Sequence, residues 1–386
     1  MNIFIVYLPR CSAFLFILSF FSRDYSHMEL VTNSMYYTIR CYQNWSHIVP
    51  RIRRKYVVVT SVFFGDTMNK FVRENESREK PVGDSECNKV TSYFPPKNIG
   101  NEIVDLRKLL KDSFDAKFRF CSFELSPIKN NDFYQSFFAE MNKYRPLFYA
   151  LTWHTKNMAK DYPSLEVIRQ FPSNTILHII IGNLTRADIL IILKKALDSG
   201  VINIFVLRGD SAIANTDFPH AVDLVRFIRN EFGNIFCICV AGYPEMHPES
   251  PSKELDLLYL KEKVDAGADL IITQVIFEAD VFIKFVNDCN KIGINVPIIP
   301  GVLSIPSYAS LEKMSKICNF RVPQGIVDIL QPIKNNDDEV RNYGIELVTN
   351  VIKDILASGT TSGFHLFTLN RTSLSSEICK KLNISR

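Results

Sequence analysis

Residues 199–210 read SGVINIFVLRGD: a glycine, then an apolar run, then the polar triplet Arg-Gly-Asp. A helical pattern precedes the glycine. A helix that stops at a left-handed glycine and is followed by a strand buried on both faces is half of a βα repeat. The same order of signals recurs at four more glycines, namely Gly233, Gly267, Gly293 and Gly359. This repetition predicts a parallel sheet whose strands alternate with helices.

Eight apolar runs in the second part of the chain have the length of buried strands. They occupy residues 118–124, 147–152, 176–181, 202–207, 235–240, 269–275, 296–300 and 363–369. Amphipathic stretches with helical spacing separate them, and a longer insertion at 302–337 precedes the last run. Eight βα units predict an α/β fold, a closed (β/α)₈ TIM barrel. An open doubly wound sheet is the alternative, but no GxGxxG turn follows any of the runs.

The front of the chain has a different character. Residues 1–60 hold seven basic and two acidic side chains, which gives them a net charge of +5. The whole chain has a net charge of +4, so the remaining residues sum to −1. The nearly neutral remainder offers no basic face, and we expect no nucleic-acid partner. We expect residues 1–105 to be a poorly structured extension, 106–378 the barrel and 379–386 a short tail.

The apolar run AFLFILSFF at residues 13–21 is too short to span a membrane as a helix. It could be an anchor, an organellar leader or sequence upstream of the true start. The nine cysteines show no CxxC pair, which predicts reduced thiols and neither a disulfide framework nor a zinc site. We therefore expect a cytoplasmic protein, with organellar targeting or membrane tethering through residues 1–22 as the alternative.

The carboxyl ends of the strands are where a barrel of this kind carries its chemistry. Polar and special residues gather there: Glu124, the TWH segment at 152–154, His178, the RGD triplet at 208–210, YPEMHPE at 243–249, Gln274 and Arg371. No lysine stands at a strand end for a Schiff base, and no His/Asp cluster stands there for a metal. The set argues against an aldolase and against a metal hydrolase.

Several of these segments occur together in a characteristic order. They are LTWH, TILH, LRGD, AVDLV, AGYPEMHPE, AGADLIITQ-x-x-FEAD, PGV and HLFTLNR. From about residue 118 to 375 the chain resembles the catalytic domain of methylenetetrahydrofolate reductases. The resemblance implies an FAD-containing barrel that passes a hydride from NADPH or NADH to 5,10-methylenetetrahydrofolate, giving 5-methyltetrahydrofolate. It also implies a homo-oligomer. An impaired flavin- or folate-binding barrel, or another flavin barrel such as a proline-dehydrogenase-like enzyme, is the alternative.

The resemblance assigns two catalytic residues. Glu124 corresponds to the general acid that protonates the nitrogen leaving the opening folate ring. Its neighbours Phe123 and Leu125 are apolar, and apolar surroundings favour the protonated form that a proton donor needs. Asp210 corresponds to the aspartate beside flavin and folate, whose fixed charge can stabilise a cationic iminium.

The resemblance also implies the binding residues. The cofactor contacts are Thr152, Trp153, His178, Arg208, Gly209, Asp210, His220, Ala221, Tyr243, His247, Pro248, Glu249, Ser250, Asp256 and Lys263. The substrate contacts are Asp210, Gln274, Phe367 and Arg371. Asp256 and Lys263 stand seven residues apart, two turns along one helix face, which would serve ribose hydroxyls and pyrophosphate together.

Two features depart from the family pattern. The segment after Glu124 reads LSPIK, where the family usually has two aromatic residues and two prolines. The chain also ends at Arg386, fifteen residues after Arg371. The resemblance therefore leads us to expect the catalytic domain alone, without the C-terminal S-adenosylmethionine-binding regulatory domain.

Overall fold

The computed structural model describes residues 3–6, 15–18, 28–33, 36–41, 103–128, 130–152, 163–209 and 215–384. The chain divides into two compact units, Met1–Val90 and Thr91–Arg386. In the first unit, β1 (Ile3–Val6) pairs antiparallel with β2 (Leu15–Leu18), and β3 (Met28–Asn33) with β4 (Tyr36–Cys41). These four strands are not predicted by the sequence pattern, which indicated a poorly structured extension at residues 1–105.

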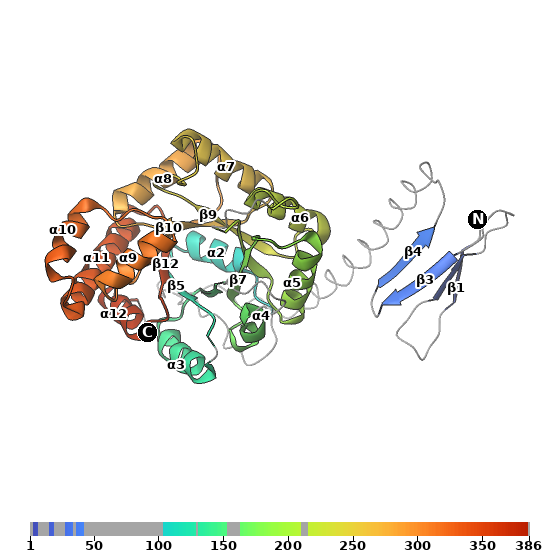
Figure 1. The fold of residues 1–386 in the computed structure, drawn as a ribbon, viewed down its shortest axis with the longest axis horizontal. Helices are drawn as coiled ribbons and strands as arrows, with labels where there is room; N and C mark the ends of the chain where they lie inside the picture. The colour runs from blue at the N-terminus through green and yellow to red at the C-terminus, as the bar shows by residue number, and fades with distance from the viewer. Residues whose placement is uncertain are drawn as a thin grey trace, which may run out of the picture. The chain divides into compact units, whose positions relative to one another are not determined.

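The second unit contains a closed parallel barrel (Figure 1). Its strands are β5 (Phe120–Leu125), β6 (Phe148–Leu151), β7 (Thr175–Ile180), β8 (Asn203–Leu207), β9 (Cys237–Gly242), β10 (Leu270–Val275), β11 (Ile298–Leu303) and β12 (Gly363–Phe367). Each strand pairs with its neighbours in sequence, and β12 pairs with β5 to close the ring. Every predicted apolar run overlaps one strand, so the (β/α)₈ prediction is confirmed.

Helices surround this barrel in Figure 1. They are α2 (Leu106–Asp115), α3 (Asn131–Met141), α4 (Pro163–Val167), α5 (Arg186–Asp198), α6 (Ala221–Phe232), α7 (Lys253–Asp265), α8 (Ala279–Lys291), α9 (Tyr308–Ile317), α10 (Gln324–Ile333), α11 (Asp337–Ser358) and α12 (Thr372–Lys381). Two 3₁₀ turns, η1 (Asn142–Tyr144) and η2 (Ile168–Gln170), complete the set of described elements. Within the described part of the chain, none of these helices combines the length and apolar character needed to cross a membrane.

The five glycines that signalled the repeat all have positive φ, from 58° at Gly233 to 114° at Gly267. At Gly359, the glycine amide donates to the carbonyl of Leu356 and ends α11 in the left-handed conformation. An L side chain is strained in that conformation, so glycine is the residue that lets the chain turn there. The helix ends inferred from sequence are therefore confirmed.

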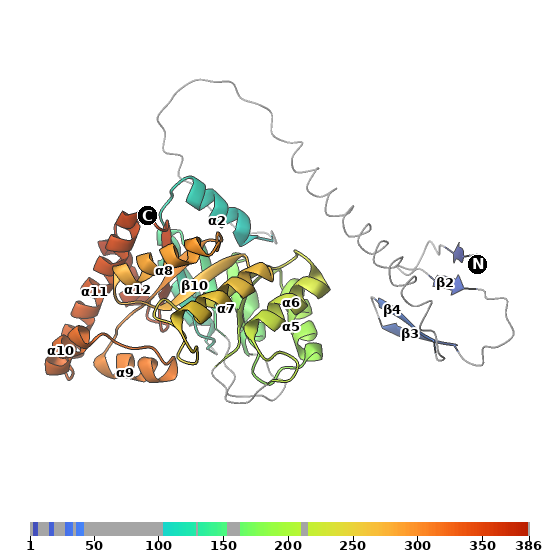
Figure 2. The same ribbon diagram turned by 90° about the horizontal axis from the view of Figure 1, so that it is seen from above.

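Helix α2 closes one end of the barrel and leaves the other for the site. Its residues Leu106, Leu109 and Leu110 are buried in one cluster with residues from the starts of the strands, such as Phe120 and Phe148. Figure 2 shows α2 and α9 at opposite ends of the barrel. Because α2 covers the amino-terminal ends of the strands, their carboxyl ends at the opposite side are the ones available for ligands.

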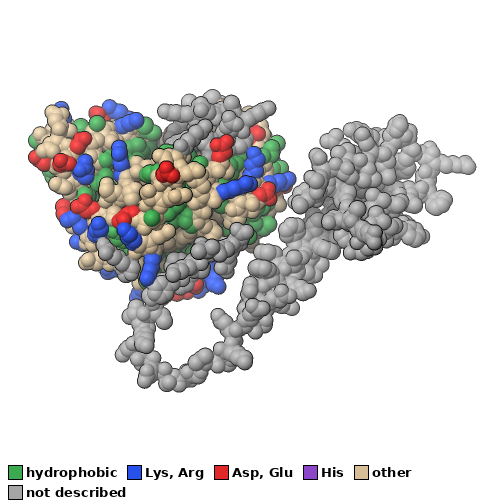
Figure 3. All heavy atoms as spheres, turned by 90° about the horizontal axis from the view of Figure 1, so that it is seen from below, with side chains coloured by type: hydrophobic (Ala, Val, Ile, Leu, Met, Phe, Trp, Pro, Cys, Tyr) green, Lys and Arg blue, Asp and Glu red, His purple; other side chains and the backbone are tan. Residues whose placement is uncertain are grey.

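The rest of the barrel surface carries charges of both signs. On the face shown in Figure 3, basic and acidic side chains are interspersed among polar and apolar ones. Elsewhere on the barrel, ion pairs form along single helices, such as Lys284 with Asp288 on α8, where the nitrogen and oxygen lie 2.8 Å apart. Interspersed charges of this kind stabilise helices modestly and keep a surface soluble.

Gly301 in β11 marks a close approach between strands. A Cβ atom added there would lie 2.3 Å from the carbonyl oxygen of Thr273 and 2.7 Å from the ring of Phe367. We predict that Gly301→Ala lowers the free energy of unfolding by about 1–3 kcal/mol, because overpacking forces backbone movement. Gly325 in α10 is the matched control, since an added Cβ there meets nothing within 4 Å. Denaturant unfolding should show Gly325→Ala to be neutral or slightly stabilising; equal losses in both variants would contradict the packing argument.

Candidate active site

Glu124 lies near the carboxyl end of β5, between two fully buried neighbours. Phe123 and Leu125 have no exposed surface, and the Glu124 side chain keeps 18% of its surface exposed. The pairing of Glu124 with Phe367 across the β5–β12 ladder fixes its height in the barrel. The carboxyl group is thus largely buried but still reaches the open end of the barrel.

Two imidazoles approach the same oxygen of Glu124. The Nε2 atom of His178 lies 3.6 Å from Glu124 Oε2, and that of His365 lies 3.7 Å from it. Both histidines are buried, His365 completely. The carboxyl group of Glu124 therefore has one imidazole from β7 and one from β12 within 3.7 Å of the same oxygen.

The hydrogen bonds of His365 fix its orientation. Ser122 Oγ lies 3.2 Å from the carbonyl oxygen of Phe364 and 2.9 Å from Nδ1 of His365. Because the serine proton goes to the carbonyl, Oγ accepts from Nδ1–H, and Nε2 of a neutral His365 faces Glu124 as an acceptor. His365 is not among the site residues predicted from the sequence. Its spacing of two residues from Phe367 on one strand, which puts both on the same face, was the signal that could have found it.

His178 is the second imidazole beside Glu124. It belongs to β7, two residues before the strand ends, and its ring meets that of Phe205 edge-on at 4.7 Å. It therefore lies deep in the barrel beside Glu124. It does not line the cavity described next.

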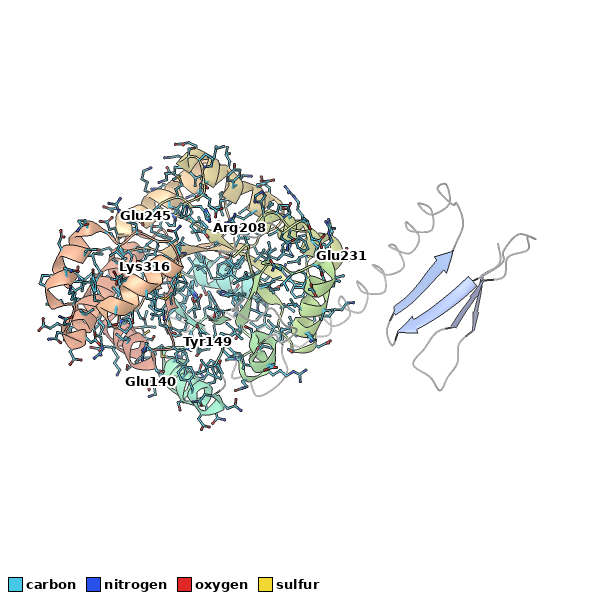
Figure 4. All side chains as sticks on the ribbon, in the orientation of Figure 1. Glu140, Tyr149, Arg208, Glu231, Glu245 and Lys316 are labelled. Atoms are coloured by element: carbon cyan, nitrogen blue, oxygen red, sulfur yellow. The ribbon has the colours of Figure 1, made fainter. Side chains whose placement is uncertain are left out.

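A separate cavity of about 380 Å³ opens between the ends of β8 and β9 and the helices α6 and α7. Figure 4 labels Arg208 on this side of the barrel. Nine residues that the resemblance proposed as cofactor contacts line the cavity: Arg208, His220, Ala221, Tyr243, His247, Glu249, Ser250, Asp256 and Lys263. The fold thus brings together residues that lie up to 55 positions apart in the chain, from 208 to 263.

Lys263 supplies a buried positive charge to this cavity. Its ammonium donates to the carbonyl of Ala241 at 2.8 Å. Burial lowers the pKa of Lys263 to about 8, and the nearby Asp256 carboxylate partly opposes that shift. Asp256 itself accepts from the hydroxyl of Ser250 at 2.6 Å. This ammonium and the nearby carboxylate offer one group for phosphate and one for hydroxyls.

Arg208 and Glu249 form an ion pair at the cavity wall, with nitrogen and oxygen 2.6 Å apart. The hydrogen bond from Arg208 lowers the pKa of Glu249. His247 accepts from the backbone amide of Glu249 through Nδ1 at 3.1 Å, and its ring contacts Tyr243 at 4.6 Å. Burial lowers the pKa of His247, so its neutral form is favoured.

The donors of this cavity suit a dinucleotide-type anion. A guanidinium and an ammonium can hold phosphate groups, and the Asp256 carboxylate can accept from ribose hydroxyls. The ring of Tyr243 offers a surface for a flat heterocycle. No group of three or more His, Cys, Asp or Glu side chains able to hold a metal occurs among the described residues.

The remaining predicted residues lie around the strand ends. Gln274 sits in β10 at a register irregularity, and its side-chain oxygen accepts from the amide of Val275 at 2.8 Å. The NH₂ group of Gln274 is therefore the part that can donate to a ligand. Arg371 is exposed and precedes α12, and Phe367 is half-buried at the end of β12.

Of the other cofactor candidates, Gly209 has a φ of 86°, and an added Cβ there would lie 2.4 Å from Ile180. Thr152 follows β6 and donates its amide to the carbonyl of Leu125 at 2.9 Å. Pro248 is exposed on the loop after β9 and does not line the cavity. Trp153 and Asp210 lie outside the described residues.

The lowered pKa of Lys263 leads to a pH-dependent prediction. The ammonium form attracts anions, and it is present below about pH 8 and lost above it. With ADP as a probe, we expect affinity to fall about tenfold between pH 7 and pH 9, because only about a tenth of the groups stay charged at pH 9. Isothermal titration calorimetry at the two pH values measures this. Unchanged affinity would mean that Lys263 does not contact the anion.

Comparison with known proteins gives a consistent result. A sequence model of the family Methylenetetrahydrofolate reductase matches residues 109–383. The chain is 36% identical over 297 residues to a "Probable methylenetetrahydrofolate reductase (NADPH)" of Caenorhabditis elegans, covering 72% of this chain and 44% of that protein. It is 38% identical over 292 residues to "Methylenetetrahydrofolate reductase (NADH) 1" of Arabidopsis thaliana, covering 70% and 48%.

A bacterial relative is matched over most of its own length. The "5,10-methylenetetrahydrofolate reductase" of Buchnera aphidicola is 31% identical over 268 residues, which cover 67% of this chain and 90% of that protein. The chain thus spans less than half of the nematode and plant proteins. Among solved structures, an uncharacterised Clostridium thermocellum protein that binds two copies of 5-methyl-5,6,7,8-tetrahydrofolic acid has a TM-score of 0.52 at 14% identity. It covers 72% of this chain and 98% of its own and shares the fold.

Proposed function

Because the chain belongs to the methylenetetrahydrofolate reductase family, we propose that it reduces 5,10-methylenetetrahydrofolate to 5-methyltetrahydrofolate. The hydride donor is NADPH or NADH, and FAD is the resident cofactor. The catalytic unit is residues 106–378. This reaction belongs to one-carbon metabolism and supplies the methyl group for methionine synthesis.

The observation that carries the proposal is the buried carboxyl group of Glu124 with two imidazoles within 3.7 Å. Opening the five-membered ring of the substrate requires a proton at the departing nitrogen. A barrel that only binds a ligand does not need a proton donor flanked by two further titratable groups. Glu124 at the open end of the barrel, with His178 and His365 beneath it, meets the requirement for general acid catalysis.

The cavity between β8 and β9 fits the phosphate and ribose portions of FAD. Lys263 and Arg208 would hold the phosphates, Asp256 the ribose hydroxyls, and Tyr243 would contact a ring. When bound, the flavin supplies a carrier for two electrons between the nicotinamide and the folate. Gly209 packs against Ile180 with a φ of 86°, so both the space and the backbone conformation require glycine next to Arg208.

The protein residues then act on the folate. Glu124 delivers a proton to the leaving nitrogen as the ring opens, and the methylene carbon becomes a cationic iminium. The carboxylate of Asp210 stabilises this cation, and the amide NH₂ of Gln274 orients the pterin ring. Hydride addition to the methylene carbon gives the methyl group. Arg371 pairs with the glutamate carboxylate of the substrate.

The names of the relatives include both NADPH and NADH, so the proposal leaves the donor as either. The six cysteines of the described part of the barrel unit are free thiols, which supports a reducing, cytoplasmic location. Helix α7 exposes Leu255, Leu258 and Tyr259 by 38%, 54% and 50%, at the i, i+3 and i+4 spacing of one helix face, and such an apolar stripe supports a homo-oligomer that covers it.

The test is a spectroscopic titration of the purified full chain. We expect a bound flavin whose absorbance bleaches when NADPH or NADH is added anaerobically and returns when methylenetetrahydrofolate follows. Bleaching without recovery would favour an impaired barrel or another flavin enzyme. The absence of bound flavin after reconstitution with FAD would reject the proposal.

A further inference from the structure

The first and last strands of the barrel meet beside Glu124. Their backbone pairing runs from Gly363 with Phe120 to Phe367 with Glu124 and ends there. Beyond this point, β5 continues into the LSPIK segment, while β12 leads into the turn at residues 368–371. The contacts that join these two segments beyond the last backbone pair determine how firmly Glu124 is positioned.

Beyond the last backbone pair, the side chain of Asn370 forms hydrogen bonds to the backbone that follows β5. Its Oδ1 accepts from the amide of Ser126 at 2.9 Å, and its Nδ2 donates to the carbonyl of Ser126 at 3.1 Å. Each bond joins residues 244 positions apart. The amide group of Asn370 thus occupies the place of a peptide group in an extended β12 strand.

A second contact holds Glu124 itself. The hydroxyl of Thr368 donates to the carbonyl oxygen of Glu124 at 2.5 Å and accepts from the amide of Asn370 at 3.1 Å. Thr368 is completely buried. Thr368 and Asn370 therefore form one hydrogen-bonded unit that contacts the backbone at Glu124 and at Ser126.

The turn that presents Asn370 has an unfavourable backbone. Leu369 and Asn370 have φ values of 50° and 58°, both left-handed. Asparagine tolerates this conformation, but leucine rarely adopts it. Such a conformation persists only where surrounding contacts hold it, and it is concentrated at functional sites.

Helix α3 also forms hydrogen bonds to the segment that follows β5. Tyr134 of α3 accepts from the amide of Ile128 at 2.7 Å through its hydroxyl, which lies 3.4 Å from the carbonyl of Ser126. Residues 126–128 are therefore bonded to α3 as well as to the turn after β12. The bonds to that turn come from the side chain of Asn370.

We propose that Asn370 is a positioning residue that locks the seam between β5 and β12, so that Glu124 and Arg371 keep a fixed separation across the folate site. Arg371 follows Asn370 directly, and its amide donates to the carbonyl of Thr368 at 2.8 Å. The hydrogen bonds of Asn370 thus keep the proton donor, Glu124, and the cationic group for the substrate, Arg371, in one rigid arrangement. The role rests on the proposed function, since it concerns the folate half of that reaction.

The test compares Asn370→Gly with Asn383→Gly in the full chain. Glycine keeps the left-handed backbone and removes both bonds to Ser126. Asn383 is a matched control, because it has a φ of 51° and lies beyond α12. We expect Asn370→Gly to slow folate-dependent recovery of flavin colour about 10- to 100-fold. Bleaching by the nicotinamide donor and flavin content should stay at the wild-type level.

Hydrogen exchange of the peptide that contains Ser126 gives a readout independent of catalysis. Its amide should exchange faster in Asn370→Gly and at the wild-type rate in Asn383→Gly. Asn370→Asp is a second variant should the glycine variant not fold. It keeps the acceptor for the Ser126 amide and sets a carboxylate oxygen against the Ser126 carbonyl, so the same changes are expected.

The outcomes separate the two hypotheses. Unchanged folate-dependent recovery in the variant would overturn the positioning role, as would an equal loss of bleaching, recovery and flavin content. If the wild-type protein shows no folate-dependent recovery, the proposed function fails. Exchange of the Ser126 amide then still decides whether Asn370 locks the seam.

Discussion

Glu124→Gln is expected to slow the transfer of reducing equivalents to methylenetetrahydrofolate by about 10²- to 10⁴-fold, the usual contribution of general acid catalysis. Glutamine keeps the shape of the side chain and its place beside His178 and His365, but it cannot release a proton. Flavin reduction by the nicotinamide donor needs no proton at the folate nitrogen, so its rate should change little. Stopped-flow absorbance of the two half-reactions measures both rates.

Glu231→Gln is the control for this variant. Glu231 is an exposed carboxylate on α6, labelled in Figure 4, and it lies outside both sites. Its substitution should leave the two half-reactions at the wild-type rate. Equal slowing of both half-reactions in Glu124→Gln would contradict the assignment of Glu124 as the acid and point to a structural role.

Lys263→Met is expected to weaken FAD binding about 10- to 100-fold, because a charge-assisted hydrogen bond to phosphate contributes about 1.5–3 kcal/mol. The same change removes a buried ammonium whose pKa is already lowered to about 8 by desolvation. The lowered pKa means that folding disfavours the ammonium form, so removing the charge relieves a desolvation cost that offsets the lost bond to Ala241. Weaker FAD binding by Lys263→Met should therefore not be accompanied by a matching loss of apoprotein stability.

Lys261→Met on the same helix is the matched control. Lys261 pairs with Asp265 along the helix and does not line the cavity. Fluorescence titration with FAD and thermal denaturation of the apoprotein should separate the two variants. If both bound FAD equally well, the cavity between β8 and β9 would not be the phosphate site.

Much of the barrel could be predicted from short stretches of sequence. Each βα unit carries an apolar run for its strand, and five of the strands are preceded by a glycine, such as Gly200 or Gly267, where the helix ends. These signals depend on backbone conformation and burial within about thirty residues, so they need no knowledge of distant contacts. The first unit, with β1 to β4, carried no such repeat and was missed.

The candidate cavity could be predicted in part. Resemblance supplied Arg208, Asp256 and Lys263 as a group, and the structure places them around one cavity. It did not predict that burial lowers the pKa of Lys263, because the pKa depends on which side chains remove water from the ammonium. Nor did it separate His178 from the other cofactor candidates, since only the height of β7 in the barrel puts that ring beside Glu124.

The sequence by itself determined the architecture and the residue types at the strand ends, because helix ends, strand length and burial are properties of neighbouring residues. The tertiary structure alone decided that His365 faces Glu124 and that Asn370 holds Ser126. Both contacts cross the seam where the barrel closes, between residues more than 240 positions apart. Their geometry depends on strand register around the whole ring, and no local pattern specifies that register.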